Sequence, residues 1–279
     1  MTAAKALILG LIQGIAEFLP ISSSGHLVLF KDMLGLSEVP LLFDVILHLA
    51  TLLAVVIVLR KRIGAIFAAL WHFLFGKKTK NAKSLTKTQK KKDEERSKNL
   101  AYVLPIIIAT VVTAVVGFLI QKFVPQEGPK VVAVEMLVTA VILGLTVLAK
   151  PGTRGPDSIG KGRAALIGLA QGIGVFSGVS RSGATISAGL FAGLDRETAG
   201  EFSFLLSIPA ILGAFILTIK DAGTMMAAVS YGHLALAFLT AFFSGMASLK
   251  ILLKIIKGGK IYWFALYLLV VGVLGLILG

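Results

Sequence analysis

Two stretches of this chain, which begin 158 residues apart, have closely similar sequences. Residues 10–26 read GLIQGIAEFLPISSSGH and residues 168–184 read GLAQGIGVFSGVSRSGA, with nine of the seventeen aligned positions identical. Each copy is apolar and ends in a turn rich in serine and glycine. A repeat of this kind in an apolar chain predicts a duplicated membrane protein, in which each half supplies one interrupted helical hairpin and the two polar loops meet at one site.

The composition of the chain indicates that it lies in a lipid bilayer and not in water. Hydrophobic residues make up 56% of the chain and charged residues 15%, which predicts an all-α polytopic membrane protein with residues 1–279 in a single membrane domain. The chain has no cysteine, so disulfides and thiol catalysis are excluded. A net charge of +14 would suggest nucleic acid as the partner of a soluble protein. Here the positive charge follows the membrane topology, and no nucleic-acid partner is expected.

Six apolar stretches are long enough to span a membrane. They are residues 42–59, 101–120, 131–149, 201–219, 233–253 and 261–279. The two repeat segments, about 3–34 and 164–195, are interrupted by their polar turns. A turn at membrane depth must lie inside protein or beside water, so both segments are expected to be re-entrant hairpins, the alternative being two ordinary spans with serine-rich kinks. Repeat half one covers about 1–150 and half two about 160–279.

Basic residues are concentrated on one side of this topology. Residues 77–98 contain ten Lys and Arg and almost nothing apolar, which predicts a solvated cytoplasmic loop. The alternation of six spans then places 22 of the 28 basic residues in the cytoplasm and both termini outside it. The two hairpins enter from opposite sides, so the topology is an inverted repeat. Residues 63–75 are expected to form a short amphipathic helix at the interface.

The two loops carry complementary chemistry. The first copy has Glu17, one helical turn after Gln13, and the run Ser22 to His26; the second copy has Arg181 between serines and glycines. Serine- and glycine-rich turns that lead into a helix present several donors to phosphate oxygens, and arginine adds a planar fork. A carboxylate, an imidazole and a serine can supply a nucleophile with its base. These residues predict phosphoryl chemistry on a lipid.

Structural alternatives exist for several of these groups. A single serine-rich kink can bond back to its own carbonyls, and Glu17 with Arg181 could be only a structural ion pair. Glu135 lies within a span and has no evident partner, whereas Glu201 is expected to be a first-turn carboxylate that the helix dipole favours. Packing or interfacial positions are expected for the remaining histidines, His48, His72 and His233.

At these motifs the chain resembles the bacterial undecaprenyl-diphosphate phosphatases of the bacitracin-resistance type, from end to end. The family's first motif, Glu/Gln-x-x-x-Glu followed by Leu-Pro-Ile-Ser-Ser-(Ser/Thr)-Gly-His, is matched by Gln13, Glu17 and Leu19 to His26. Its second motif, Pro-Gly-x-Ser-Arg-Ser-Gly-x-Thr, is matched by Gly178, Ser180, Arg181, Ser182, Gly183 and Thr185. Two positions depart from the family pattern: Gln13 replaces a common Glu, and Ser177 replaces the usual Pro.

The resemblance implies removal of the terminal phosphate of undecaprenyl diphosphate. Ser23 or His26 is then the nucleophile, with His26 as general base or acid if Ser23 attacks, while Glu17 orients or deprotonates the nucleophile or binds a cation, and Arg181 holds the diphosphate. Further ligands of the substrate are expected at Gln13, Ser22, Ser24, Gly178, Ser180, Ser182, Gly183 and Thr185.

The resemblance also implies a cofactor, a cellular location and an oligomeric state. Mg²⁺ or Ca²⁺ could assist, with Glu17 as its ligand, and no organic cofactor is expected. The expected location is the inner membrane of a bacterial cell, with the site opening to the outer side, and a homodimer is one option. A lipid-phosphate transporter or flippase would use the same midplane site. The enzyme is favoured because the Ser-Ser-Ser-Gly-His run provides a nucleophile and a base, which transport does not need.

Overall fold

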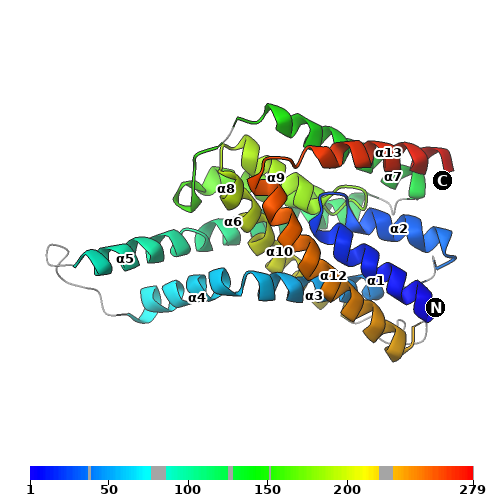
Figure 1. Cartoon of the computed structure of the whole chain (residues 1–279), viewed down its shortest axis with the longest axis horizontal. Coiled ribbons are helices and arrows are strands. Elements are labelled where there is room, and N and C mark those ends of the chain that lie inside the picture. Colours follow the sequence, from blue (N-terminus) through cyan, green and yellow to red (C-terminus); the bar gives the residue numbers. More distant parts are fainter. Residues whose placement is uncertain (37–38, 77–85, 125–127, 151, 220–228, 279) are drawn as a thin grey trace.

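The computed structural model describes the whole chain except residues 37–38, 77–85, 125–127, 151, 220–228 and 279. The described residues form helices, with no strand beyond one isolated bridge between Arg154 and Leu194 (Figure 1). The first half contains α1 (Ala3–Phe18), α2 (Ser23–Met33), α3 (Leu41–Val58), α4 (Arg60–Phe75), α5 (Lys87–Leu100), α6 (Val103–Phe123) and α7 (Pro129–Leu145). The second half contains α8 (Lys161–Ile173), α9 (Arg181–Phe191), α10 (Arg196–Thr218), α12 (Tyr231–Lys257) and α13 (Trp263–Leu278).

Among the described residues, five helical stretches are long and apolar enough to cross a membrane. They include α3, α6, α7, α10 and α12, so the all-α polytopic class is confirmed. The sixth predicted span, 261–279, forms α13, which is apolar but only 16 residues long. At 1.5 Å per residue this helix reaches about 24 Å, short of the ~30 Å hydrocarbon core. Six full spans are therefore not established by helix length.

Residues 77–85 of the predicted loop at 77–98 lie outside the described residues, and the prediction is wrong over the second part, because Lys87–Leu100 is helix α5. This run consists largely of Lys, Glu, Gln and Arg, which are good helix formers. Thr86 begins the helix with a capping box, in which its hydroxyl and the Gln89 side chain exchange hydrogen bonds with the backbone. Charge density alone had suggested a loop, but helix propensity and capping decide here.

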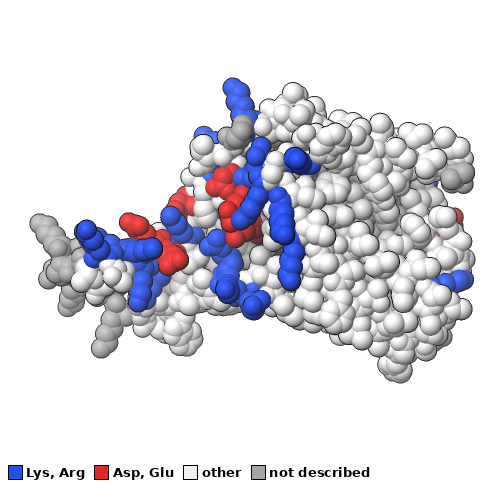
Figure 2. Space-filling view, viewed as in Figure 1, with Lys and Arg blue, Asp and Glu red and all other residues white. Residues whose placement is uncertain are grey.

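Helices α4 and α5 extend together from one end of the bundle (Figure 1). The predicted helix at 63–75 is present, although it starts at Arg60 and continues α3 after only Leu59. Figure 2 shows that, on the face in view, Lys and Arg gather over this end of the molecule. The opposite end is almost uncharged in the same view. Charge is thus segregated along the molecule, as the sequence predicted.

Glu201 differs from its predicted position in a first helical turn. Helix α10 begins at Arg196, so Glu201 lies in the second turn. Its carboxylate forms an ion pair with Arg62 Nη2 at 2.9 Å and accepts a hydrogen bond from the Tyr102 hydroxyl at 3.0 Å. Glu201 therefore connects α10 to the base of the α4–α5 extension instead of capping its own helix.

The first helix of each half packs against a helix of the other half. Helix α1 lies along α12, and α8 lies along α6. Gly10 of α1 approaches the backbone of Ala237, and the equivalent repeat position, Gly168 of α8, approaches the backbone of Ala109. A Cβ atom at either glycine would overlap a backbone carbonyl. Small residues allow this close helix packing in membranes, and here they fix where the polar turns after α1 and α8 come to lie.

Candidate active site

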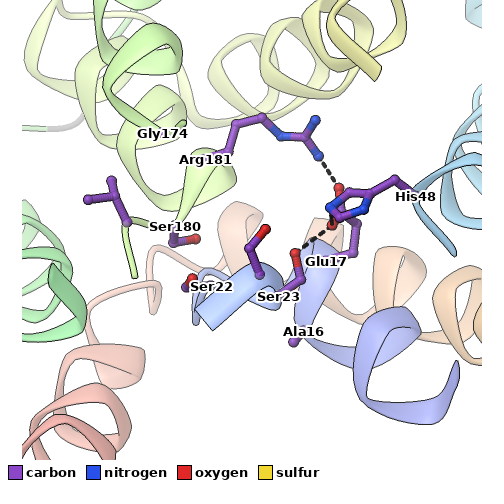
Figure 3. Close-up of a pocket in the computed structure, with 10 residues that line it drawn as sticks. Ala16, Glu17, Ser22, Ser23, His48, Gly174, Ser180 and Arg181 are labelled. Carbon is purple, nitrogen blue, oxygen red and sulfur yellow. Dashed lines mark hydrogen bonds and ion pairs between the residues drawn. The ribbon is translucent and has the colours of Figure 1, made fainter. Parts of the chain in front are cut away.

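Two helices begin at equivalent positions of the repeat and point their N-termini at one cavity (Figure 3). Ser22 caps α2 by accepting a hydrogen bond from the N–H of Gly25, and Ser180 caps α9 by accepting one from Gly183. Ser22 has a φ of 67°, the one positive φ of a non-glycine residue in the described chain. A serine rarely adopts this left-handed backbone, and such strain is common at functional sites.

The turns before these two helices touch each other. The Ser22 hydroxyl donates a hydrogen bond to the carbonyl oxygen of Ser177, which joins the two halves of the chain. Two helix N-termini in this arrangement direct the positive ends of their dipoles at the same space. That space is therefore suited to an anion before any charged side chain is considered.

The cavity between the two turns has a volume of about 90 Å³. That is well above the ~10–15 Å³ that one water needs on this measure, and well below the ~300–1,000 Å³ of pockets for drug-sized ligands. The cavity can therefore hold a phosphate-sized group but not an isoprenoid chain. Its lining is mostly polar and consists of Ala16, Glu17, Ser22, Ser23, Ser24, His48, Gly174, Val179, Ser180 and Arg181.

Glu17 lies at the centre of the contacts around this cavity and is buried. Its Oε1 forms an ion pair with Arg181, so the first and second repeats meet as opposite charges. Its Oε2 accepts a hydrogen bond of 2.6 Å from the Ser23 hydroxyl and one of 2.9 Å from Gln13 Nε2. A buried carboxylate is costly unless it is paired and hydrogen-bonded, and Glu17 satisfies both conditions.

His48 is a member of this cluster, so its predicted role in packing is wrong. Its Nε2 lies 3.3 Å from Glu17 Oε2, and its side chain lines the cavity. His48 comes from α3, outside both repeat motifs. The available signal was a single imidazole in the middle of an 18-residue apolar helix, where ionisable groups are expensive and usually functional.

His26 is placed differently from the sequence expectation. Its Nδ1 lies 2.8 Å from the carbonyl oxygen of Ser22, and its Nε2 lies 2.7 Å from the hydroxyl of Tyr267 on α13. A carbonyl oxygen only accepts, so Nδ1 carries the proton and Nε2 accepts from Tyr267. His26 is also absent from the cavity lining. The structure thus brings Ser23 to Glu17 and not to His26, and it adds Tyr267, which sequence reasoning missed.

Gly178 packs the second loop against α7. Its N–H donates a hydrogen bond of 2.7 Å to Glu135 Oε2, so the prediction that Glu135 has no partner is wrong. Gly178 lies against the backbone of Val132, where a Cβ atom would overlap the carbonyl oxygen. A glycine is required by this close approach, and the loop is held against α7.

The remaining predicted ligands hold the loops together. The Ser182 hydroxyl donates to the carbonyl oxygen of Phe18 at 3.1 Å, and Thr185 Oγ1 donates to the carbonyl oxygen of Arg181 at 2.9 Å. Both side chains are buried and outside the cavity lining. Of the residues predicted in the second loop, Ser180 and Arg181 line the cavity; of those in the first, Ser22, Ser23 and Ser24 do.

The described side chains around Glu17 do not match the ligand set of a divalent cation. No group of three or more His, Cys, Asp or Glu side chains gathers among the described residues. Both oxygens of Glu17 already face donors from Arg181, Ser23, Gln13 and His48. These side chains do not form a metal site by themselves. The expectation of Mg²⁺ or Ca²⁺ at Glu17 stays a prediction.

The fold and the site together define a class: an all-helical membrane protein with a buried serine–carboxylate pair beside a small polar cavity at two helix N-termini. Comparison with known proteins gives the family. Residues 6–274 match the family described as Bacitracin resistance protein BacA, and the chain belongs to that family.

Curated relatives match over nearly the whole chain. An undecaprenyl-diphosphatase of Treponema denticola is 46% identical over 272 residues, covering 98% of this chain and 96% of that protein. One of Desulforapulum autotrophicum is 42% identical over 277 residues, covering 99% and 98%. One of Oceanobacillus iheyensis is 35% identical over 278 residues, covering 97% and 94%.

Proposed function

We propose that this protein is an integral membrane phosphatase that hydrolyses undecaprenyl diphosphate to undecaprenyl phosphate and inorganic phosphate. The product is the lipid carrier that peptidoglycan and other envelope polymers need for another round of synthesis. One observation carries the proposal: the Ser23 hydroxyl donates to the buried carboxylate of Glu17 in a cavity that Arg181 and two helix N-termini make favourable for anions. The names of the relatives agree with it.

The cavity volume indicates how the substrate binds. The terminal phosphate enters the cavity, while the isoprenoid chain stays outside in the lipid. Arg181 can turn from Glu17 Oε1 to the phosphate oxygens, which it matches with a bidentate fork. Glu17 then loses one neighbouring positive charge and accepts a proton more readily. Binding of the substrate thereby prepares the carboxylate to act as a base.

The chemistry follows from the hydrogen bond between Ser23 and Glu17. Ser23 Oγ attacks the terminal phosphorus and passes its proton to Glu17 Oε2, and the bond from that phosphorus to the bridging oxygen breaks. Undecaprenyl phosphate leaves, and a phosphoserine remains. Water then attacks the phosphorus of the phosphoserine, and the bond from that phosphorus to Ser23 Oγ breaks. Glu17 returns its proton to Ser23 Oγ, and the protons of the water leave with the inorganic phosphate. The sum of the steps consumes one water and releases one phosphate.

Phosphate release by the purified protein tests this function directly. We expect the detergent-solubilised chain to release phosphate from undecaprenyl diphosphate, whereas Glu17→Gln releases almost none because it cannot accept the serine proton. Colorimetric phosphate assays, with and without a chelator, measure both the activity and its need for a divalent cation. Tight binding of the lipid by the wild-type protein without phosphate release would contradict the enzyme and favour a carrier.

We also propose that α1–α2 and α8–α9 are re-entrant hairpins of two inverted repeats, within residues 1–150 and 160–279. The exchange of packing between halves supports it, since α1 packs on α12 as α8 packs on α6. Polar turns interrupt both pairs, as expected where backbone lies beside a water-filled cavity. In this topology the α4–α5 extension is cytoplasmic, the membrane is the inner membrane, and the cavity opens to the outer side.

Cysteine labelling tests the topology in a chain that has no cysteine of its own. In intact cells, a membrane-impermeant maleimide should label Tyr231→Cys, at the exposed start of α12, but label Lys90→Cys on α5 only after permeabilisation. The reason is that the basic α4–α5 extension stays on the cytoplasmic side. The parent chain is the unlabelled control. Labelling of both positions from the same side would overturn the inverted arrangement.

A further inference from the structure

His48 is the cavity residue that neither repeat motif supplies. It lies on α3 of the first half, which packs against α12 and α10 of the second half. Figure 3 shows its ring beside Glu17, on the opposite side of the carboxylate from the cavity wall formed by Ser22 and Ser180. The nearest atoms are His48 Nε2 and Glu17 Oε2, at 3.3 Å. The oxygen that receives the Ser23 hydroxyl is therefore also the one that faces this imidazole.

The other ring nitrogen decides which proton lies between them. His48 Nδ1 lies 2.7 Å from the carbonyl oxygen of Asp44, one helical turn earlier. A carbonyl oxygen can only accept, so Nδ1 carries a hydrogen. Without a second proton, the Nε2 lone pair would face the lone pairs of Glu17 Oε2 and repel them. A proton between Nε2 and Oε2 would remove this repulsion, and the 3.3 Å separation of the two atoms is within the range of an ion pair.

This contact addresses a difficulty in the reaction. Arg181 is the main partner of Glu17 Oε1, and it is also the group expected to hold the phosphate. If Arg181 turns to the substrate, Glu17 loses its contact at Oε1 and is then held through Oε2, which faces Ser23, Gln13 and His48. His48 stands on a different helix and faces the other oxygen, so its contact with Glu17 can persist while Arg181 moves.

We propose that His48 is a positioning residue, which keeps Glu17 Oε2 directed at the Ser23 hydroxyl through a proton between Nε2 and Oε2. This inference rests on the proposed function and deepens it. His48 acts on the reaction through Glu17, so its loss should slow the chemical step and leave binding of the diphosphate to Arg181 and the two helix N-termini largely intact. His26 has no such role, since its Nδ1 contacts Ser22 and its Nε2 contacts Tyr267.

Two substitutions separate this role from packing. His48→Leu keeps an apolar side chain of moderate size but has no N–H, whereas His48→Gln restores an amide N–H near the position of Nε2. We expect His48→Leu to lower kcat on undecaprenyl diphosphate by about 10- to 100-fold with little change in KM, because a slightly misplaced base costs about this much. His48→Gln should recover most of the loss. The matched control is His233→Leu on α12, because the ring of His233 contacts Ser230 and not Glu17.

A second measurement makes the result independent of the substrate. A fluorophosphonate reacts with an activated serine without any lipid, and its rate of attachment to Ser23 reports how well Glu17 serves that hydroxyl. His48→Leu should slow this labelling by the same factor as it slows kcat, and His48→Gln should restore it. If His48→Leu does not fold, the same comparison is made with His48→Ala and His48→Gln.

The outcomes are distinct. The inference would be overturned if His48→Leu matches the wild type in kcat and in labelling. It would also be overturned if His48→Gln is no more active than His48→Leu, or if Ser23 is never labelled. If the wild type releases no phosphate from the lipid but labels Ser23 in a His48-dependent way, the proposed function fails and the positioning role stands.

Discussion

Replacing Ser23 by alanine is expected to reduce phosphate release from undecaprenyl diphosphate by at least ~10³-fold, since removing a nucleophile commonly costs several powers of ten. The Ser23 hydroxyl is the one that donates to Glu17 Oε2 at 2.6 Å, so alanine removes both the oxygen that we propose as the nucleophile and its proton. Binding of the lipid diphosphate should remain, because Arg181 and the starts of α2 and α9 are unchanged. Steady-state kinetics combined with a lipid-binding assay measures the two effects separately.

Ser24→Ala is the matched comparison. Ser24 also lines the cavity, but the serine that donates a hydrogen bond to Glu17 is Ser23. We therefore expect this neighbouring variant to lose much less activity. Acid quenching during turnover identifies the intermediate, since phosphoserine survives acid and phosphohistidine does not. An acid-labile phosphoenzyme, or a Ser23→Ala protein that keeps its rate, would transfer the role of nucleophile to His26.

Replacing Arg181 by lysine is expected to lower kcat/KM by more than about tenfold, or ~1.4 kcal/mol. Lysine keeps the positive charge but loses the planar fork, which can hold two phosphate oxygens at once. Lysine is a sharper test than alanine. Arg181→Ala would leave the buried Glu17 without its guanidinium, and breaking a buried pair in this way destabilises a protein by roughly 3–5 kcal/mol.

Arg163→Lys serves as the control for the chemistry of the substitution. Arg163 donates hydrogen bonds to the carbonyl oxygens of Ala192 and Ser158, away from the cavity. The same change there should leave the kinetics near those of the wild type. Wild-type kcat/KM in Arg181→Lys would show that a point charge is sufficient, and that the fork geometry does not contribute to recognition of the diphosphate.

The internal repeat made much of the site predictable. Its alignment places Ser22 opposite Ser180, and both serines cap helices that begin at the same cavity. It also separated Glu17 in one copy from Arg181 in the other, and these two side chains do meet. Hydropathy predicted the membrane class for a similar reason, because both the repeat and the apolar stretches can be read directly from the order of residues along the chain.

Contacts between helices distant in sequence could not be predicted in this way. His48 and Tyr267 lie on apolar helices outside the repeat motifs, and only packing shows that one faces Glu17 and the other His26. Proximity in sequence was misleading for Ser23 and His26. Both lie in the first turn of α2, but their hydrogen bonds go to different partners, Glu17 for Ser23 and Ser22 with Tyr267 for His26.

The ion pair between the two repeats has a consequence for how such a gene can evolve. Alignment of the copies places Val175 opposite Glu17 and Ser23 opposite Arg181, so each copy lacks the charge that the other supplies. Gene conversion that made the second copy identical to the first would create two buried carboxylates and no guanidinium. Conversion in the other direction would remove the carboxylate of Glu17 and replace Ser23 by a second arginine. The duplicated halves are therefore bound to remain different, however similar the helices around them stay.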